Sequence, residues 1–238
     1  GSGITGLTVA LLLARQGHDV AVLEAGPRVA PLLRGFWREG LYFDTGFHCG
    51  GGLHAGGVLR RWLRALGVEK HLRQITTGRT EVFHFADGQV FQLPAGQAAV
   101  TEAVERQFPG AGPAMKAFLH HMDTELGHSP YLNPAVRAEP SFALHSAGSV
   151  AQYAESAGFP PHLRAMLGTR CLLYGVRPEE SSLEEYSLVA GPYFQSSGSW
   201  QGGGLALVEA LLGCLGELGV TVRCNAAVAD IEADKAQG

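Results

Sequence analysis

The sequence of 238 residues has little charge and lacks the patterns of several common chemistries. Charged residues make up 17% and the formal net charge is −4, so a nucleic-acid partner is not predicted. No apolar run reaches the ~18 residues that a membrane-spanning helix needs. The four cysteines form no C-x-x-C pair, which favours free thiols in a reducing compartment and a cytoplasmic protein. No nucleophile turn of the hydrolase type is present either.

Histidine, cysteine and carboxylate side chains are not spaced as metal ligands usually are. His48 and His54 are near each other in the sequence, but no cysteine or carboxylate accompanies them at ligand spacing. The pair Glu184-Glu185 could suggest acid–base work, although a solvent-facing helix surface is the simpler interpretation. The sequence therefore predicts no metal site and assigns no catalytic residue.

Glycines at the start of the chain form the most informative motif. Gly1, Gly3 and Gly6 follow the G-x-G-x-x-G spacing, and Gly17 ends the helix that this spacing predicts. The apolar run of residues 20–23 then predicts a strand, and Glu24 follows it. This is the order of parts in a dinucleotide-binding βαβ unit.

Each part of this motif has a physical role in binding a dinucleotide. A helix N-terminus attracts a pyrophosphate because its first N–H groups are unpaired and its dipole is positive there. Gly1 allows the tight turn, Gly3 lets a phosphate approach the backbone, and Gly6 lets the helix lie close to the sheet. Glu24 is eighteen residues beyond Gly6, close to the spacing of about 20 for an acid that binds a ribose.

A β-strand should precede the first glycine, and the sequence begins on that glycine. Such a strand would lie in the middle of the sheet. We therefore expect that residues are missing before Gly1, and the end at Gly238 does not resemble a domain boundary. For the chain alone we expect little or no catalysis.

The remainder of the chain is mostly helical, with α/β patterns at its two ends. Helical spacing predicts helices at 58–66, 97–107, 114–126, 149–157, from Pro161, from Pro178 to about 190, and at 205–218. Strands are expected at 41–43, 220–222 and 228–231, and a hairpin at 81–93 turns at Asp87-Gly88. The glycines at 50–52 predict either close packing on a cofactor or a loose turn, and those at 202–204 predict close approach of a helix.

This distribution predicts an α/β protein with an interrupted nucleotide domain. Residues 1–57 and 198–238 would form a Rossmann-type domain that lacks its first strand, and residues 58–197 would form an inserted, mainly helical α+β substrate domain. Aromatic residues of the inserted part could line an apolar channel or belong to an ordinary core. They are Tyr153, Phe159, Tyr174, Tyr186, Tyr193 and Phe194.

Three segments together resemble one flavoprotein family. They are GSGITG…VLEA at the start, Phe43-Asp-Thr-Gly-Phe-His48, and Gly202-Gly-Gly…Leu218-Gly-Val…Asn225-x-x-Val228-x-x-Ile231. The pattern is similar to that of the phytoene desaturases, carotenoid isomerases and retinol saturases, within the wider amine-oxidase-like group. The resemblance covers the whole chain, although members of that family are roughly twice as long.

The resemblance implies FAD as the cofactor and assigns residues to it. The pyrophosphate would lie against Gly1, Ser2, Gly3, Thr5 and Gly6, and Glu24 would bond the ribose beside Ala25. Val228 would hold the adenine through its backbone, and Gly46 and His48 would approach the cofactor from the other side. For His48, a hydrogen bond to a backbone carbonyl remains the alternative.

One position departs from the family pattern. The family usually has Gly-Gly shortly after the acidic residue, where this chain has Ala30 and Pro31. A Cβ atom and a fixed φ replace flexible backbone there, so the loop takes another path or contacts the cofactor less closely.

The resemblance implies an FAD-dependent oxidoreductase that desaturates, saturates or isomerises an apolar polyene, with possible peripheral contact to a membrane. Two alternatives stay open. One is a non-catalytic protein that binds prenylated proteins, as GDP-dissociation inhibitors do on a similar scaffold. The other is an NAD-dependent dehydrogenase, which Glu24 permits because an acid favours a ribose without a 2′-phosphate. The oligomeric state is not predicted.

Overall fold

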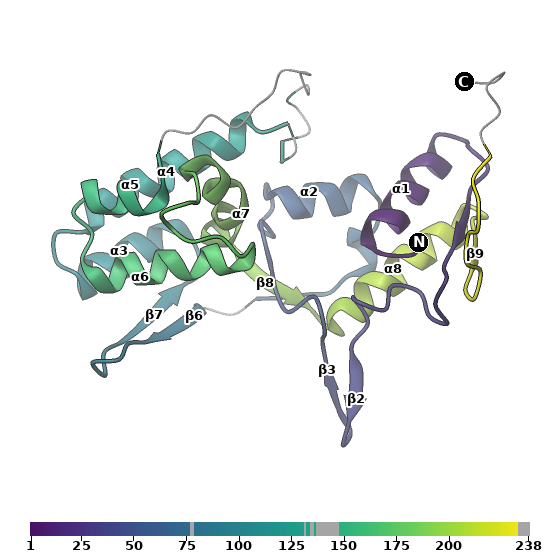
Figure 1. Ribbon diagram of the computed structural model, residues 1–238, viewed down its shortest axis with the longest axis horizontal. Helices are drawn as coiled ribbons and strands as arrows, with labels where there is room; N and C mark the ends of the chain where they lie inside the picture. Colours follow the sequence, from purple (N-terminus) through teal and green to yellow (C-terminus); the bar gives the residue numbers. More distant parts are fainter. Residues whose placement is uncertain (77–78, 131, 134–135, 137–147, 233–238) are drawn as a thin grey trace. The chain divides into compact units, whose positions relative to one another are not determined.

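The computed structural model describes residues 1–76, 79–130, 132–133, 136 and 148–232. Within this part, the chain divides into two compact units (Figure 1). Unit 1 contains Gly1–His48, Trp62–Ile75 and the residues from Ser199 onward, and unit 2 contains Cys49–Arg61 and Thr76–Gly198. Compared with the expected boundaries, residues 62–75 belong with unit 1. The reason is packing, since Leu63, Leu66 and Val68 are buried there.

Unit 1 is built from two packed helices and a short parallel sheet. Helix α1 (Ile4–Arg15) packs against α8 (Gly203–Glu217), and strand β1 (Ala21–Leu23) pairs in parallel with β9 (Thr221–Arg223). The first helix ends as expected, because Gly17 adopts a φ of 87° that favours glycine. The remaining elements are β2 (Phe36–Arg38), β3 (Leu41–Phe43), the second half of α2 (Val58–Ala65), η1 (Glu69–His71) and β5 (Gln74–Ile75).

Unit 2 is mainly helical and carries one hairpin. Its helices are α3 (Gln97–Gln107), α4 (Gly112–His128), α5 (Val150–Ser156), α6 (Pro161–Thr169), η2 (Arg170–Leu173) and α7 (Leu183–Gln195). Strands β6 (Arg79–His84) and β7 (Val90–Pro94) form the expected antiparallel hairpin. Helix α5 starts at the expected residue, because Ser149 and Gln152 form a capping box.

A hydrophobic core fills unit 2. The aromatic rings of Phe118, Phe159, Tyr186 and Phe194 all belong to it, and Tyr186 and Phe118 are fully buried. The Tyr186 hydroxyl donates a hydrogen bond of 3.0 Å to the carbonyl of Leu167. Phe159, Tyr186 and Phe194 are therefore core residues, as the simpler of the two interpretations predicted for them, and Tyr153 and Tyr174 are partly buried against the same core.

An ion pair between a buried arginine and a partly exposed glutamate lies in unit 2. The Arg170 side chain is 4% exposed and its Nη2 is 3.2 Å from Oε2 of Glu81. Its guanidinium also lies over the rings of Tyr193 and Phe194, at 5.3 and 4.9 Å from their centroids. The aromatic faces therefore replace part of the hydration that the cation loses on burial.

Several expectations about individual elements were wrong. Residues 228–231 form no strand, and Val228 and Ile231 are exposed. Helix α7 starts at Leu183 rather than near Pro178, because the Ser182 hydroxyl accepts the N–H of Glu185 and caps it there. Glu184 is only 6% exposed rather than solvent-facing.

The glycines at 50 and 51 do not form the loose turn that was one of the two expectations for residues 50–52. Gly50–Gly51 form a strand, β4, which pairs antiparallel with β8 (Ser197–Trp200). A Cβ atom on Gly51 would lie 2.6 Å from the backbone of Pro192 and Tyr193. The glycine thus permits direct packing of the strand on α7.

Among the described residues, no helix combines the length and the apolar character required to cross a membrane.

Candidate functional site

The N-terminal end of α1 is open to a ligand. The first helical hydrogen bond runs from Leu7 N–H to the carbonyl of Gly3, so the N–H groups of Ile4, Thr5 and Gly6 have no partner within the helix. Gly3 is the N-cap and offers no side chain, and the first turn contains no acidic residue. Such an end can bind an anion, because its N–H groups and the helix dipole point outward.

The three glycines of this turn differ in their surroundings. A Cβ atom on Gly6 would lie 2.0 Å from the carbonyl oxygen of Gly1, so the turn itself requires a glycine there. A Cβ atom on Gly3 would meet nothing within 4 Å, and Gly3 is exposed. The fold of the described residues therefore does not require Gly3 to lack a side chain.

Glu24 lies next to this helix end and is held by three hydrogen bonds. Its Oε2 accepts the Ser2 hydroxyl at 2.5 Å and the Ser2 N–H at 2.8 Å, and its Oε1 accepts the Gly26 N–H at 2.8 Å. The Ser2 hydroxyl, followed by the two backbone N–H groups, lowers the pKa of Glu24 to about 2. The carboxylate is thus ionised at neutral pH and retains lone pairs for further donors.

The Ser2 side chain has a role that the sequence did not predict. Its side chain is fully buried, and its hydroxyl oxygen accepts the N–H of Ala30 at 3.0 Å while donating to Glu24. The side chain therefore positions Glu24 and the following loop.

The segment that contains Val228 lies beside the Glu24 loop. The Asn225 N–H donates to the Gly26 carbonyl and the Ala226 N–H donates to the Glu24 carbonyl, both at 2.9 Å. Asn225 has a φ of 53°, which turns the chain directly after β9. Val228 is thus two residues from a direct backbone contact with Glu24, although the expected strand is absent. Ala25 lies between the two bonded residues and is exposed.

Residues 30–34, which include the departure from the family pattern at Ala30 and Pro31, connect this network to Gly46. Ala30 adopts a φ of 48°, so it keeps a backbone conformation that favours glycine despite its Cβ atom. Further along, the Leu32 carbonyl accepts the Thr45 hydroxyl at 3.2 Å, and a Cβ atom on Gly46 would lie 2.3 Å from the same carbonyl oxygen. Gly46 is therefore required by close backbone packing, and His48 is exposed two residues later.

Asp44 has a role that the sequence alone did not assign. Its Oδ1 accepts the N–H of Gly204 at 2.9 Å, at the start of α8, where the N-cap residue Gly202 has no side chain. A Cβ atom on Gly203 would lie 2.1 Å from the Asp44 carboxylate, and one on Gly204 would lie 2.2 Å from the Leu33 carbonyl oxygen. The glycines at 203 and 204 thus permit close approach of α8, as expected. One feature of the sequence could have indicated this role: α8 begins with glycines, which offer no capping side chain, so a carboxylate from elsewhere could cap it.

Together these groups can bind the adenosine diphosphate portion of a dinucleotide. The open end of α1 provides N–H donors for a pyrophosphate, and ionised Glu24 provides an acceptor for ribose hydroxyls. The exposed positions of Gly1, Gly3 and Thr5 leave the approach to these groups clear. The residues present therefore fit the FAD that the family resemblance implies.

Comparison with known proteins gives a consistent result. The sequence model of the flavin containing amine oxidoreductases matches residues 4–238. The chain is 25% identical to the all-trans-retinol 13,14-reductase of Danio rerio, over 96% of this chain and 41% of that protein. The chain thus spans about two fifths of the length of this relative.

Solved structures show the same fold at lower sequence identity. An oxidoreductase from Methanosarcina mazei matches with a TM-score of 0.68 and 18% identity, over 99% of this chain and 52% of that one. A Rab GDI from Plasmodium falciparum matches with a TM-score of 0.57 and 11% identity, over 99% of this chain and 59% of that one. Since the family model covers nearly the whole sequence, the chain belongs to the flavin containing amine oxidoreductase family, and its cofactor is FAD.

Proposed function

We propose that the protein is an FAD-dependent oxidoreductase that acts on an apolar polyene, by desaturation, saturation or isomerisation of a retinoid or carotenoid. The observation that carries the cofactor part of this proposal is the open end of α1 beside the ionised Glu24. The name of the Danio rerio relative, a retinol 13,14-reductase, favours saturation of a retinoid among these reactions.

Residues 1–6 and 24–26 would bind and orient the cofactor in this proposal. The N–H groups of Ile4, Thr5 and Gly6 would donate to the pyrophosphate, and the Glu24 carboxylate would accept ribose hydroxyls. The backbone near Val228 would contact the adenine, and Gly46 and His48 would lie on the opposite side of the cofactor. FAD supplies the hydride chemistry when it is bound, so the protein has no need of an acid–base pair for that step.

Two matched glycine substitutions test the cofactor site. Both Gly3→Ala and Gly213→Ala place a Cβ atom in open space, so both variants should fold. Only Gly3→Ala should weaken FAD binding, by about tenfold or more, because its methyl group lies where the phosphate approaches the backbone. Quenching of flavin fluorescence measures the affinity. Equal affinities for the two variants would contradict the proposed site.

The same titration addresses the chain by itself. We propose that residues 1–238 bind FAD only weakly in isolation, because the assigned residues account for the adenosine diphosphate portion and none is assigned to the isoalloxazine ring. Tight binding by the isolated chain would contradict this.

A non-catalytic binder of prenylated proteins is the second candidate. The likeness to a Rab GDI supports it at the level of fold alone, whereas the flavin family supports the redox function. Binding of a prenylated peptide by a flavin-free preparation would favour the binder. Release of FAD on denaturation of a purified longer protein that contains this chain and spans the length of its relatives, together with turnover of all-trans-retinol, would favour the oxidoreductase. Tight binding of NADH in place of FAD would favour a dehydrogenase.

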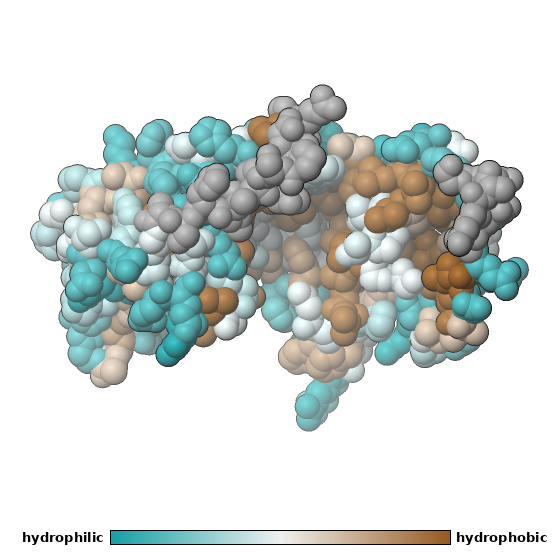
Figure 2. All heavy atoms as spheres, turned by 45° about the horizontal axis from the view of Figure 1, so that its top comes forward, coloured by the Kyte–Doolittle hydropathy of each residue, from teal (hydrophilic) through white to brown (hydrophobic). Residues whose placement is uncertain are grey.

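Contact with a membrane surface is proposed for the β2–β3 hairpin. Phe36, Trp37 and Leu41 on this hairpin are 49%, 70% and 64% exposed. Its tip, which carries Arg38 and Glu39, is hydrophilic, so contact would be limited to the headgroup region where aromatic rings gather (Figure 2). Trp37→Ser should reduce co-sedimentation with phosphatidylcholine vesicles, and Leu172→Ser in unit 2 is the control.

A further inference from the structure

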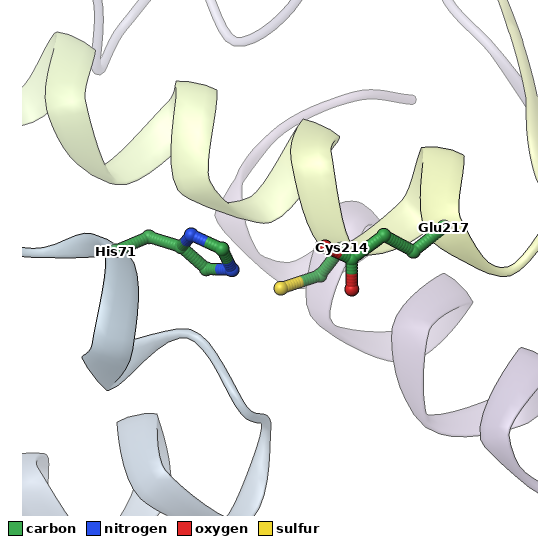
Figure 3. A group of neighbouring side chains, drawn as sticks. All are labelled: His71, Cys214 and Glu217. Atoms are coloured by element: carbon green, nitrogen blue, oxygen red, sulfur yellow. The ribbon is translucent and has the colours of Figure 1, made fainter.

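A histidine, a cysteine and a glutamate come together in unit 1, away from the groups assigned to FAD. His71 ends η1, and Cys214 and Glu217 lie three residues apart on α8. One potential ligand atom from each residue lies within 4.8 Å of the others. In Figure 3 the His71 ring points toward the sulfur of Cys214, with the Glu217 carboxylate next to it.

One of the three side chains is buried and two are exposed, so a ligand could bind to a fixed sulfur while the other two side chains adjust. Cys214 is 3% exposed and its Sγ lies 3.7 Å from the Gly67 carbonyl oxygen, so the sulfur is fixed in the packed part of α8. His71 and Glu217 are exposed and can rotate. Ligand atoms around a tetrahedral zinc ion are about 3.3–3.8 Å apart, given Zn–S near 2.3 Å and Zn–N or Zn–O near 2.1 Å. Closing the group thus requires a shift of about 1 Å by the two exposed side chains.

The nearby charges permit this shift. Lys70 Nζ is 3.8 Å from Glu217 Oε2, and both side chains are mostly exposed, so the pair is weak and a cation can displace the lysine. Burial and, after it, Glu217 raise the pKa of the Cys214 thiol, and Lys70 and Arg15 oppose this only in part.

We infer that His71, Cys214 and Glu217 form a binding site for a borderline-soft divalent cation of the Zn²⁺ type, with a fourth position open to water. Nitrogen, sulfur and a single carboxylate are ligands for zinc, whereas Mg²⁺ and Ca²⁺ require oxygen ligands. Such an ion would join residues 69–71 to the C-terminal part of α8. About ten residues, or about 15 Å of helix, separate it from the end of α8 that Asp44 caps.

A titration with Zn²⁺ against a chromophoric chelator, in the presence of a non-thiol reductant, tests the site. One equivalent should bind to the wild-type chain. His71→Gln and Glu217→Gln change exposed side chains, so both should fold, and each should weaken binding at least about tenfold. Cys214→Ser should weaken it at least about a hundredfold.

Co²⁺ identifies the ligand directly. The wild-type chain with Co²⁺ should show a near-ultraviolet thiolate charge-transfer band, which Cys214→Ser removes and Cys49→Ser retains. Cys49 is the matched control because it is the exposed thiol of unit 2. The inference is overturned if binding follows Cys49, or if His71→Gln and Glu217→Gln bind Zn²⁺ as the wild type does. If Cys214→Ser fails to fold, Zn²⁺ binding by His71→Gln and Glu217→Gln tests the inference. None of these measurements depends on FAD.

Discussion

The two units differ sharply in how completely they bury their own apolar residues. Of the eighteen exposed large hydrophobic side chains in the described part of the molecule, fourteen belong to unit 1 and four to unit 2. The face of α1 that carries Ile4, Val9, Leu12 and Leu13 is the clearest case, and Figure 2 shows hydrophobic surface gathered there. Helices close a core by packing on one another, whereas a parallel sheet needs cover on both faces.

The physical reason lies in the strands. Sheet β1–β9 has two strands of three residues each, too few to support a layer of helices on both sides. Unit 2 needs no sheet of this kind, because α3, α4 and α7 pack on one another around Phe118 and Tyr186. We therefore expect unit 2 to be the more stable unit and unit 1 to depend more on what it binds.

The largest expected effect concerns the core of unit 2. Phe118→Ala should lower the free energy of unfolding of unit 2 by about 3–5 kcal/mol, since it removes a fully buried ring. Leu11→Ala, in the smaller core of unit 1, should cost about 2–3 kcal/mol. Hydrogen exchange resolved by residue measures each unit separately. Equal losses in the two units would remove the contrast between their cores.

The next effect concerns pH and is specific to unit 1. The pKa of Glu24 is about 2 in the folded chain, below its ordinary value of 4.5. Its hydrogen bonds thus stabilise unit 1 above pH ~4.5 and are lost as the pH falls from ~4.5 toward ~2. Glu24→Gln should therefore flatten the pH dependence of the urea midpoint of unit 1 between pH 3 and pH 7. Glu102→Gln, on the surface of unit 2, is the control, and an unchanged profile in Glu24→Gln would refute the network.

A smaller expected effect concerns association through the exposed apolar side chains of the two units. The double variant Val9→Gln, Leu12→Gln replaces apolar groups on the exposed face of α1 and should reduce light scattering of the chain, with a change in stability within about 1 kcal/mol. Leu172→Gln with Leu173→Gln makes the same change on unit 2 and should alter scattering less. If both double variants behave alike, the apolar face of α1 is not what drives association.

The smallest effect compares two buried alanines. Ala30→Gly relieves a φ of 48° but loses a buried methyl group, so the free energy of unfolding should change by less than about 0.5 kcal/mol. Ala190→Gly, buried within α7, relieves nothing and should cost about 1–2 kcal/mol. Chemical denaturation measures both. A loss in Ala30→Gly as large as that in Ala190→Gly would mean that the positive φ carries no strain.

Local signals in the sequence predicted much of the fold. Residues 149–157 and the hairpin turning at Asp87-Gly88 were predicted correctly, because a capping box and a turn dipeptide act over a few residues. The start of α7 was missed because Pro178 was taken as the start signal, whereas the Ser182 hydroxyl caps the helix at Leu183. Strands β4 and β8 were missed because glycine and serine carry no strand signal.

For the candidate site, the sequence by itself determined the chemistry of the loop, namely the glycine spacing and the acid after the strand. The tertiary structure decided the rest: that Ser2 holds Glu24, that Asp44 caps α8, and that His71 lies beside Cys214 and Glu217. Spacing along the chain specifies contacts only within a helix, a turn or a βαβ unit. Contacts between residues far apart in the sequence depend on which apolar faces pack together, and no local pattern encodes that choice.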